Sequence, residues 1–225
     1  MTVVAGIDGC RGGWLMVRRT PESGRTDFVI FERWADLPAA DMIAVDMPIG
    51  LPDSGERGCD REARQLLGKR RSSVFLGLRR PLLDFPDYPS ANEWAKSDGK
   101  GLSKQAWFLL DKIREIDGAI TPEDQARIRE THPELAFLAL KGGPLDHPKK
   151  TPAGQAERIE LLEAAGFGPI QPRLDLLGPE RAQPDDLLDA CALALAAERM
   201  LAGEAKRLPD DPPRDGKGLA MEIWY

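Results

Sequence analysis

The sequence is poor in the residues that build disulfide frameworks and histidine-based sites. Its 225 residues include three cysteines, which form no CxxC pair: Cys10, Cys59 and Cys191. An odd, widely spaced set argues against a disulfide framework and against a zinc site. Only two histidines are present, so a histidine-rich metal site or a Ser-His-Asp triad has little material. We expect a reducing, cytoplasmic environment and a site built from other side chains.

Long apolar segments and common phosphate-binding motifs are also missing. No apolar run approaches the roughly 20 residues that span a bilayer, and the N-terminus shows no signal-peptide pattern. We therefore expect no membrane association. The motifs GxGxxG and GxxxxGK[ST] are absent, which argues against classical dinucleotide and P-loop sites. The formal charge of −6 disfavours strong nonspecific nucleic-acid binding, although it permits a local basic groove.

The overall composition is that of a folded globular protein. Apolar residues make up 42% and charged residues 30% of the chain. The length suits a single α/β domain, residues 1–225, that carries an insertion.

The first stretch, TVVAGIDGCRGGWLMV, predicts a strand–turn–strand unit that carries one acid. The apolar run over residues 3–7 is typical of a buried strand, and Asp8 follows it directly. The glycines after Asp8 allow a tight turn, and Trp14 begins a second strand-like run. An ordinary hairpin in which Asp8 caps the turn is the alternative interpretation.

A later strand also ends on an acid. Residues 26–34 predict a third strand from their β-branched and aromatic content. Residues 42–49 (MIAVDMPI) predict a fourth, which carries Asp46 and is interrupted by Pro48. In open α/β sheets, ligands bind outside the carboxyl ends of the strands. We therefore expect Asp8 and Asp46 to belong to one site.

The region after the fourth strand differs in composition and predicts helices. We interpret residues 52–120 as an insertion that covers the site. Within it, residues 103–117 (SKQAWFLLDKIREID) show apolar side chains at three- and four-residue spacing, which predicts one helix. Further helix starts are predicted where proline follows a capping residue or precedes an acid, at Thr121-Pro122, Pro133 and Thr151-Pro152.

The last long helix, from Pro184, begins with acids and continues with alanine and leucine. Asp186 and Asp189 are three residues apart and share a helix face. That face continues into apolar residues, so unpaired charge on it would be costly. We interpret the pair as metal-facing. Simple stabilisation of the helix N-terminus is the alternative.

Six segments together resemble one protein family over nearly the whole chain. They are GIDGCRGGW, VDMPIGL, RRSSVF, SKQAWFLLDKIREID, ETHPELAF and DDLLDA. The chain resembles the bacterial and archaeal family catalogued as domain of unknown function 429, often described as predicted nucleases. The order of strands and acids resembles the ribonuclease H-like fold, and most closely its RuvC branch. This resemblance implies an α/β fold with a mixed sheet flanked by helices and a helical insertion after the fourth strand.

The chemistry that the resemblance implies is metal-dependent hydrolysis of phosphodiester bonds. Two Mg²⁺ or Mn²⁺ ions, about 3.5–4 Å apart, would bracket the scissile phosphate. Asp8 would be the ligand shared by both ions. Asp46, Asp186 and Asp189 would complete the carboxylate set, because hard cations prefer oxygen ligands. Glu134, within ETHPE, is a further catalytic candidate, although an acid after a helix-starting proline is also ordinary capping.

The expected substrate is a nucleic acid, either DNA or RNA. Candidate phosphate-binding residues are Arg70, Arg71, Ser72 and Ser73, because guanidinium groups and hydroxyls suit phosphate oxygens. A solvated basic turn is the alternative interpretation of this run. Lys149 is a further candidate.

Two other functions remain open. The actin and sugar-kinase superfamily shares the implied core and uses a glycine-rich hairpin after the first acid to hold nucleotide phosphates. The chain is therefore a candidate nucleotide- or phosphometabolite-binding protein or phosphotransferase. It is too short for the duplicated cleft of those kinases unless a homodimer supplies the other half. A scaffold with a vestigial site is the third interpretation.

Overall fold

A mixed sheet forms the centre of the first part of the molecule. The computed structural model describes residues 1–225, and the sheet has the strand order β3-β2-β1-β4-β5. β1 pairs antiparallel with β2, and β2 with β3, whereas β1–β4 and β4–β5 are parallel. The predicted α/β class, with a mixed sheet flanked by helices, is confirmed. The strands are β1 (Val4–Cys10), β2 (Gly13–Thr20), β3 (Arg25–Phe31), β4 (Met42–Val45) and β5 (Ile128–Glu130).

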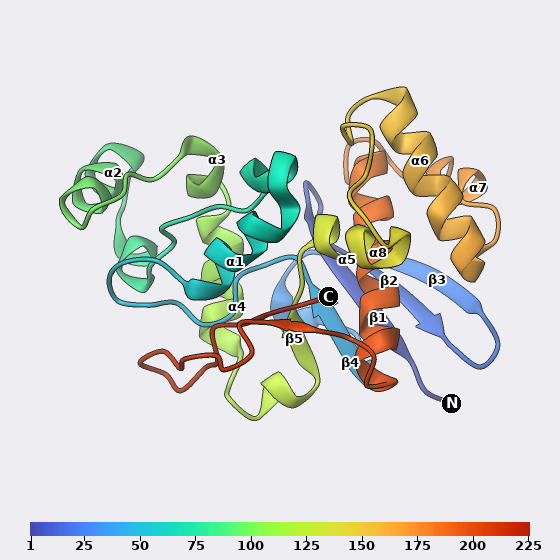
Figure 1. The fold of residues 1–225 in the computed structure, drawn as a ribbon, viewed down its shortest axis with the longest axis horizontal. Coiled ribbons are helices and arrows are strands. Elements are labelled where there is room, and N and C mark those ends of the chain that lie inside the picture. Colours follow the sequence, from blue (N-terminus) through green and yellow to red (C-terminus); the bar gives the residue numbers. More distant parts are fainter. The chain divides into compact units, whose positions relative to one another are not determined.

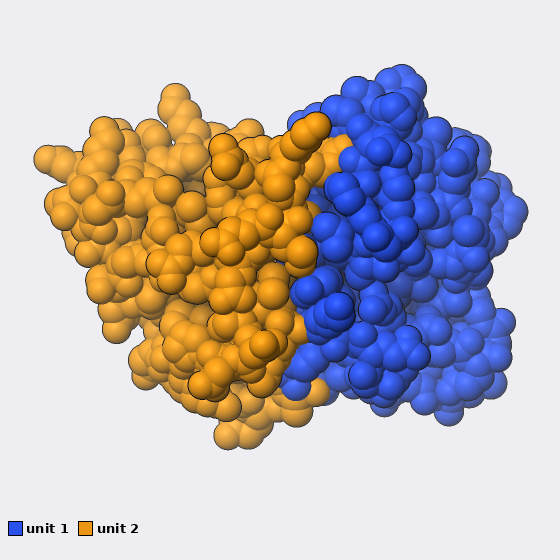
Figure 2. Space-filling view, viewed as in Figure 1, with its two compact units in different colours: residues 1–46, 127–206, 224–225 blue, residues 47–126, 207–223 orange.

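The chain divides into two compact units (Figure 2). The first contains residues 1–46, 127–206 and 224–225, and the second contains residues 47–126 and 207–223. The predicted insertion, residues 52–120, falls within the second unit. The single-domain organisation stays a prediction.

Except for the short turn η1, the helices of the first unit follow the sheet strands in the sequence. Two of their predicted starts are explained by caps: Thr151 accepts a hydrogen bond from the amide of Gly154, and His132 Nδ1 accepts one from the amide of Glu134. None of the helices in the structure has the length and apolar composition needed to cross a bilayer. The elements are η1 (Trp34–Asp36), α5 (Pro133–Lys141), α6 (Pro152–Leu162), a π-helical turn η5 (Glu163–Phe167), α7 (Gln171–Leu174) and α8 (Pro184–Leu201).

Helix α8 lies along the sheet and contacts β1, β4 and β2 (Figure 1). A Cβ on Gly6 would lie 2.1 Å from the carbonyl oxygen of Ala190, so only glycine permits this approach. Val4 clusters instead with Leu193 and Ala197. As β1 proceeds from residue 4 to residue 6, its contacts therefore move back along α8. The helix runs antiparallel to β1, and its N-terminus lies toward the end of β1 that carries Asp8.

The second unit consists mainly of short helices. Arg79 lies buried at its centre and donates hydrogen bonds to the carbonyl oxygens of Gly77, Ala95 and Lys100 and to the Asp98 carboxylate. Its elements are α1 (Gly58–Leu67), η2 (Gly68–Ser73), η3 (Arg80–Asp84), α2 (Tyr88–Ser97), α3 (Lys104–Trp107), α4 (Leu110–Ala119), η4 (Asp124–Ala126) and β6 (Arg207–Leu208). Near the chain end, β6 pairs with β7 (Ile223–Trp224).

Two predicted helices differ in the structure. The expected helix over residues 103–117 is broken into α3 and α4, because the Leu109 amide donates to the Ala106 carbonyl in a tight three-residue turn. The three- and four-residue spacing of apolar side chains continues through this break, so the sequence pattern predicts a single helix. The start predicted at Thr121-Pro122 yields only the 3-10 turn η4, after which the chain enters β5.

Candidate functional site

Asp8 and Asp46 occupy neighbouring positions on two parallel strands. Ile7 of β1 pairs with Val45 of β4, and the Asp46 amide donates to the Ile7 carbonyl at 2.9 Å. Asp8 follows Ile7 within β1, and Asp46 follows Val45 directly after the end of β4. Adjacent strands lie about 4.8 Å apart and side chains alternate between faces, so both carboxylates project from the same face. That is the face of Gly6, which packs against α8.

Helix α8 brings further carboxylates to the same place. Its N-terminal turns lie toward Asp8, two residues beyond Gly6 on β1. The charges of Asp186 and Asp189 both raise the pKa of Asp8, as does the charge of Asp46. The structure thus brings together the four carboxylates that the sequence predicted as metal ligands. Their role as ligands stays a prediction.

Burial is the largest influence on the strand carboxylates. Both side chains keep some accessible surface, but the surrounding protein is dense enough that loss of hydration dominates. Burial, followed by repulsion from Asp46 and the helix acids, raises the pKa of Asp8 well above its usual value. Burial also raises the pKa of Asp46, although the charges of His132 and then Lys149 oppose this. Negative charge here is therefore costly without a cation.

Lys149 enters this cluster from the loop before α6. Its Nζ lies 2.9 Å from Asp189 Oδ2 and 3.5 Å from Asp185 Oδ2. The lysine side chain is 39% exposed and the Asp189 side chain 5% exposed, so the two partners differ in hydration. The neighbouring carboxylates outweigh desolvation for the lysine and raise its pKa. For Asp189, burial outweighs the pairing and raises the pKa to about 6.

The remaining helix acid has a local structural role. Asp186 Oδ2 accepts a hydrogen bond from the Gln183 amide at 2.8 Å, and the pair forms a capping box at the start of α8. This is the stabilisation of the helix N-terminus that the sequence left open. By contrast, the causes that shift the pKa of Asp8 and of Asp46 are burial and the charges of other groups.

Thr131 is a residue of this edge that the sequence analysis missed. Its amide donates to the Val45 carbonyl at 2.9 Å, which makes it the strand neighbour of Asp46, on the same face. The residue is 1% exposed, and its hydroxyl has no hydrogen-bond partner in the protein. In the sequence, residues 126–132 fit either a continuation of the helix predicted from Thr121-Pro122 or a strand, so the pattern does not place Thr131. Recognition of β5 as a strand would have placed Thr131 at this edge.

Glu134 forms a buried ion pair in the first turn of α5. Arg158 Nη2 lies 2.5 Å from Glu134 Oε1, and the guanidinium carbon lies over the Phe137 ring, 5.3 Å from its centroid. The Arg158 charge also acts to lower the pKa of Asp189. Glu134 therefore belongs to a charged cluster beside the site and has its own cation. A catalytic role for Glu134 stays a prediction.

The predicted phosphate-binding run lies in the second unit. Arg70, Arg71, Ser72 and Ser73 lie in η2, where the Ser73 hydroxyl donates to the Arg70 carbonyl at 2.9 Å. No side chain of this helix is buried. Contact of this run with a phosphate stays a prediction.

The donor chemistry of the sheet edge fits a hard divalent cation. No group of three or more His, Cys, Asp or Glu side chains is arranged to hold a metal ion. The helix acids contact the Lys149 ammonium and the Gln183 amide. The oxygens left over are the carboxylates of Asp8 and Asp46 and the orphaned hydroxyl of Thr131. Mg²⁺ accepts such oxygen ligands and keeps several of its waters, so a small protein donor set suffices.

Comparison with known proteins identifies the family. No curated protein and no solved structure matches the chain. One family model matches residues 6–214, a range that includes every residue of the sheet edge and helix start described above. The chain therefore belongs to the family described as "Protein of unknown function (DUF429)".

Proposed function

We propose that this protein is a divalent-metal-dependent nuclease that hydrolyses phosphodiester bonds of DNA or RNA. The observation that supports this most directly is the pair of adjacent carboxylates, Asp8 and Asp46, on neighbouring parallel strands with no protein cation in direct contact. The strand order, with α8 packed on β1, is compatible with a ribonuclease H-like core. Residues 52–120 would then be a helical insertion in that core.

Within this proposal, the residues have separable tasks. Asp8, Asp46 and Thr131 would hold a Mg²⁺ or Mn²⁺ ion through oxygen atoms. Such an ion would supply Lewis-acid polarisation of a phosphoryl oxygen. The helix dipole of α8 partly offsets the charge of the acids at its N-terminus. Arg70 and Arg71 stay candidates for binding phosphate groups of the nucleic acid.

The nucleotide-binding alternative has less support from the glycine-rich hairpin. The Gly12 amide donates to the Arg181 carbonyl at 2.7 Å. A Cβ on Gly13 would lie 2.3 Å from the Phe31 carbonyl oxygen, and the residue has φ of 114°. Packing and turn geometry thus account for these two glycines without a bound phosphate.

Cleavage assays test the nuclease proposal. We would incubate the purified protein with end-labelled single-stranded, duplex, hybrid and branched substrates in Mg²⁺, Mn²⁺ or EDTA. We expect metal-dependent cleavage of at least one substrate, lost in Asp8→Asn and kept in Asp211→Asn, which changes an exposed acid. Equal cleavage by Asp8→Asn would reveal a contaminating nuclease, and absence of cleavage from all substrates would contradict the proposal.

A further inference from the structure

The Lys149 ammonium directly contacts two of the helix acids, Asp185 and Asp189. It forms a charge-assisted hydrogen bond with Asp189 at 2.9 Å and lies within ion-pair distance of Asp185. The Lys149 charge also acts on Asp8 and Asp46, where it opposes part of the rise in pKa that burial causes. A single ammonium thus neutralises part of a cluster that contains several carboxylates.

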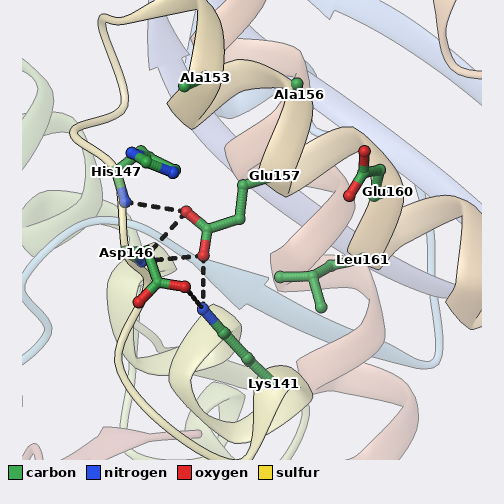
Figure 3. Close-up of a pocket in the computed structure, with 8 residues that line it drawn as sticks. All are labelled: Lys141, Asp146, His147, Ala153, Ala156, Glu157, Glu160 and Leu161. Atoms are coloured by element: carbon green, nitrogen blue, oxygen red, sulfur yellow. Dashed lines mark hydrogen bonds and ion pairs between the residues drawn. The ribbon is translucent and has the colours of Figure 1, made fainter.

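The backbone that carries Lys149 is held in place by α6. Glu157 accepts hydrogen bonds from the amides of Asp146, at 2.8 Å, and His147, at 3.0 Å, and from Lys141 Nζ at 2.6 Å. Figure 3 shows this carboxylate at the edge of a pocket of about 530 Å³, with its contacts to the loop and to α5. These contacts fix the segment just before Lys149.

The segment is fixed from the other side as well. A Cβ on Gly154 would lie 2.0 Å from the Pro148 carbonyl oxygen, so the absence of a side chain allows α6 to approach the loop. Thr151 Oγ1 accepts from the Gly154 amide at 3.1 Å and donates to the Pro148 carbonyl at 2.8 Å. The backbone on both sides of Lys149 is therefore fixed by contacts with α6.

The helix-side and strand-side carboxylates differ in whether a cation or hydrogen-bond donor of the protein contacts them. On the helix side, Asp185 and Asp189 contact Lys149, and Asp186 is bound to the Gln183 amide. On the strand side, Asp8 and Asp46 have no such partner, and the neighbouring Thr131 hydroxyl is buried without a hydrogen bond. The two sides therefore differ in direct contacts: the helix-side acids contact an ammonium, and the strand-side acids contact no cation of the protein.

We propose that Lys149 is a permanent cation of the site, so that the site binds one divalent ion, at Asp8 and Asp46, instead of two. The ammonium takes the position beside Asp189 that a second ion would otherwise occupy. This inference rests on the proposed metal-dependent function and specifies the number of ions and the residues that hold them.

The stoichiometry of Mn²⁺ binding tests the inference without any substrate. We would titrate the full-length protein with Mn²⁺ by calorimetry at pH 7.5 and record electron paramagnetic resonance spectra. We expect one Mn²⁺ per chain in the wild type and in Lys150→Met, a matched control at the exposed neighbouring lysine. Lys149→Met is expected to bind two, with the spin coupling of ions about 3.5–4 Å apart. Two ions or none in the wild type, or one ion in folded Lys149→Met, would overturn the inference.

A second pair of variants keeps the test decisive if Lys149→Met does not fold. Asp189→Asn is expected to keep one Mn²⁺, since that carboxylate is held by the lysine. Asp46→Asn is expected to bind none. Loss of Mn²⁺ binding in folded Asp189→Asn, or retention in Asp46→Asn, would contradict the assignment of the ion to the strand side.

Failure of this inference is distinguishable from failure of the nuclease proposal. A protein that binds one Mn²⁺ and cleaves no nucleic acid keeps the role of Lys149 and loses the nuclease function. A protein that cleaves nucleic acid and binds two ions keeps the function and loses the role of Lys149.

Discussion

Gly6 and Ala190 approach so closely that a Cβ on Gly6 would lie 2.1 Å from the Ala190 carbonyl oxygen. This contact allows α8 to pack directly on β1 and fixes the position of the helix relative to the strand. Asp189 immediately precedes Ala190, and Asp8 lies two residues beyond Gly6. The distance between the helix acids and the strand acids therefore depends on a position that tolerates no side chain.

Gly6→Ala tests this dependence. The added methyl group meets backbone atoms, which cannot move as a flexible side chain can, so α8 must shift. We expect a loss of roughly 3 kcal/mol or more of unfolding free energy, at the upper end of overpacking costs, measured by denaturant unfolding. Gly143→Ala serves as the control, since nothing lies within 4 Å of its added Cβ. Equal stability of the two variants would contradict the packing argument.

Thr131→Val separates metal binding from stability. Valine has nearly the shape of threonine and removes a buried hydroxyl that lacks a partner. We expect the metal-free variant to be more stable than the wild type by about 1–3 kcal/mol, and its Mn²⁺ affinity to be lower. Chemical denaturation in EDTA and calorimetric titration measure the two effects. A metal-free variant that is less stable would show that the hydroxyl has another role.

Asp8→Asn should have a pH-dependent effect on stability when metal is absent. The pKa of Asp8 is raised in the folded state above its usual value of 3.8. At pH values above 3.8, the folded protein therefore binds more protons than the unfolded chain. The contribution of Asp8 to stability therefore falls as the pH rises from about 4 through the folded pKa. Asparagine removes this penalty.

In EDTA, we expect Asp8→Asn and the wild type to unfold at similar temperatures near pH 4. At pH 7.5 the variant should unfold at least about 2 °C higher, the shift that 1 kcal/mol produces in a chain of this size. Added Mn²⁺ should raise the unfolding temperature of the wild type alone. A variant less stable than the wild type at pH 7.5 in EDTA would refute the repulsion argument.

Arg158→Met tests the buried ion pair with Glu134. The arginine side chain is 1% exposed and the glutamate 10% exposed, so removal of the guanidinium leaves a buried, uncompensated carboxylate. We expect a loss of about 3–5 kcal/mol of unfolding free energy, partly recovered in the double variant with Glu134→Gln. The exposed pair Arg18–Asp27, at 38% and 44% exposure, is the control, and Arg18→Met should cost less than about 1 kcal/mol.

Several features of the fold could be predicted from the sequence because they depend on near neighbours. The apolar run before Asp8 and the apolar residues around Ala44 predicted strands, and the structure has β1 and β4 there. The prolines at 133, 152 and 184 each open a helix. The choice of carboxylates as candidates also followed from their places at strand and helix ends, which short-range periodicity and capping define.

The tertiary structure decided which charges meet. Lys149 and Asp189 are 40 residues apart, and no local pattern relates them. Thr131 became part of the edge only through its pairing with Val45, which lies on a strand from the beginning of the chain. Strand register and helix seating are set by packing between distant segments. The sequence by itself therefore identified the candidate carboxylates. The packing at Gly6 and the contacts of α6 determined which of these carboxylates contact a cation and which do not.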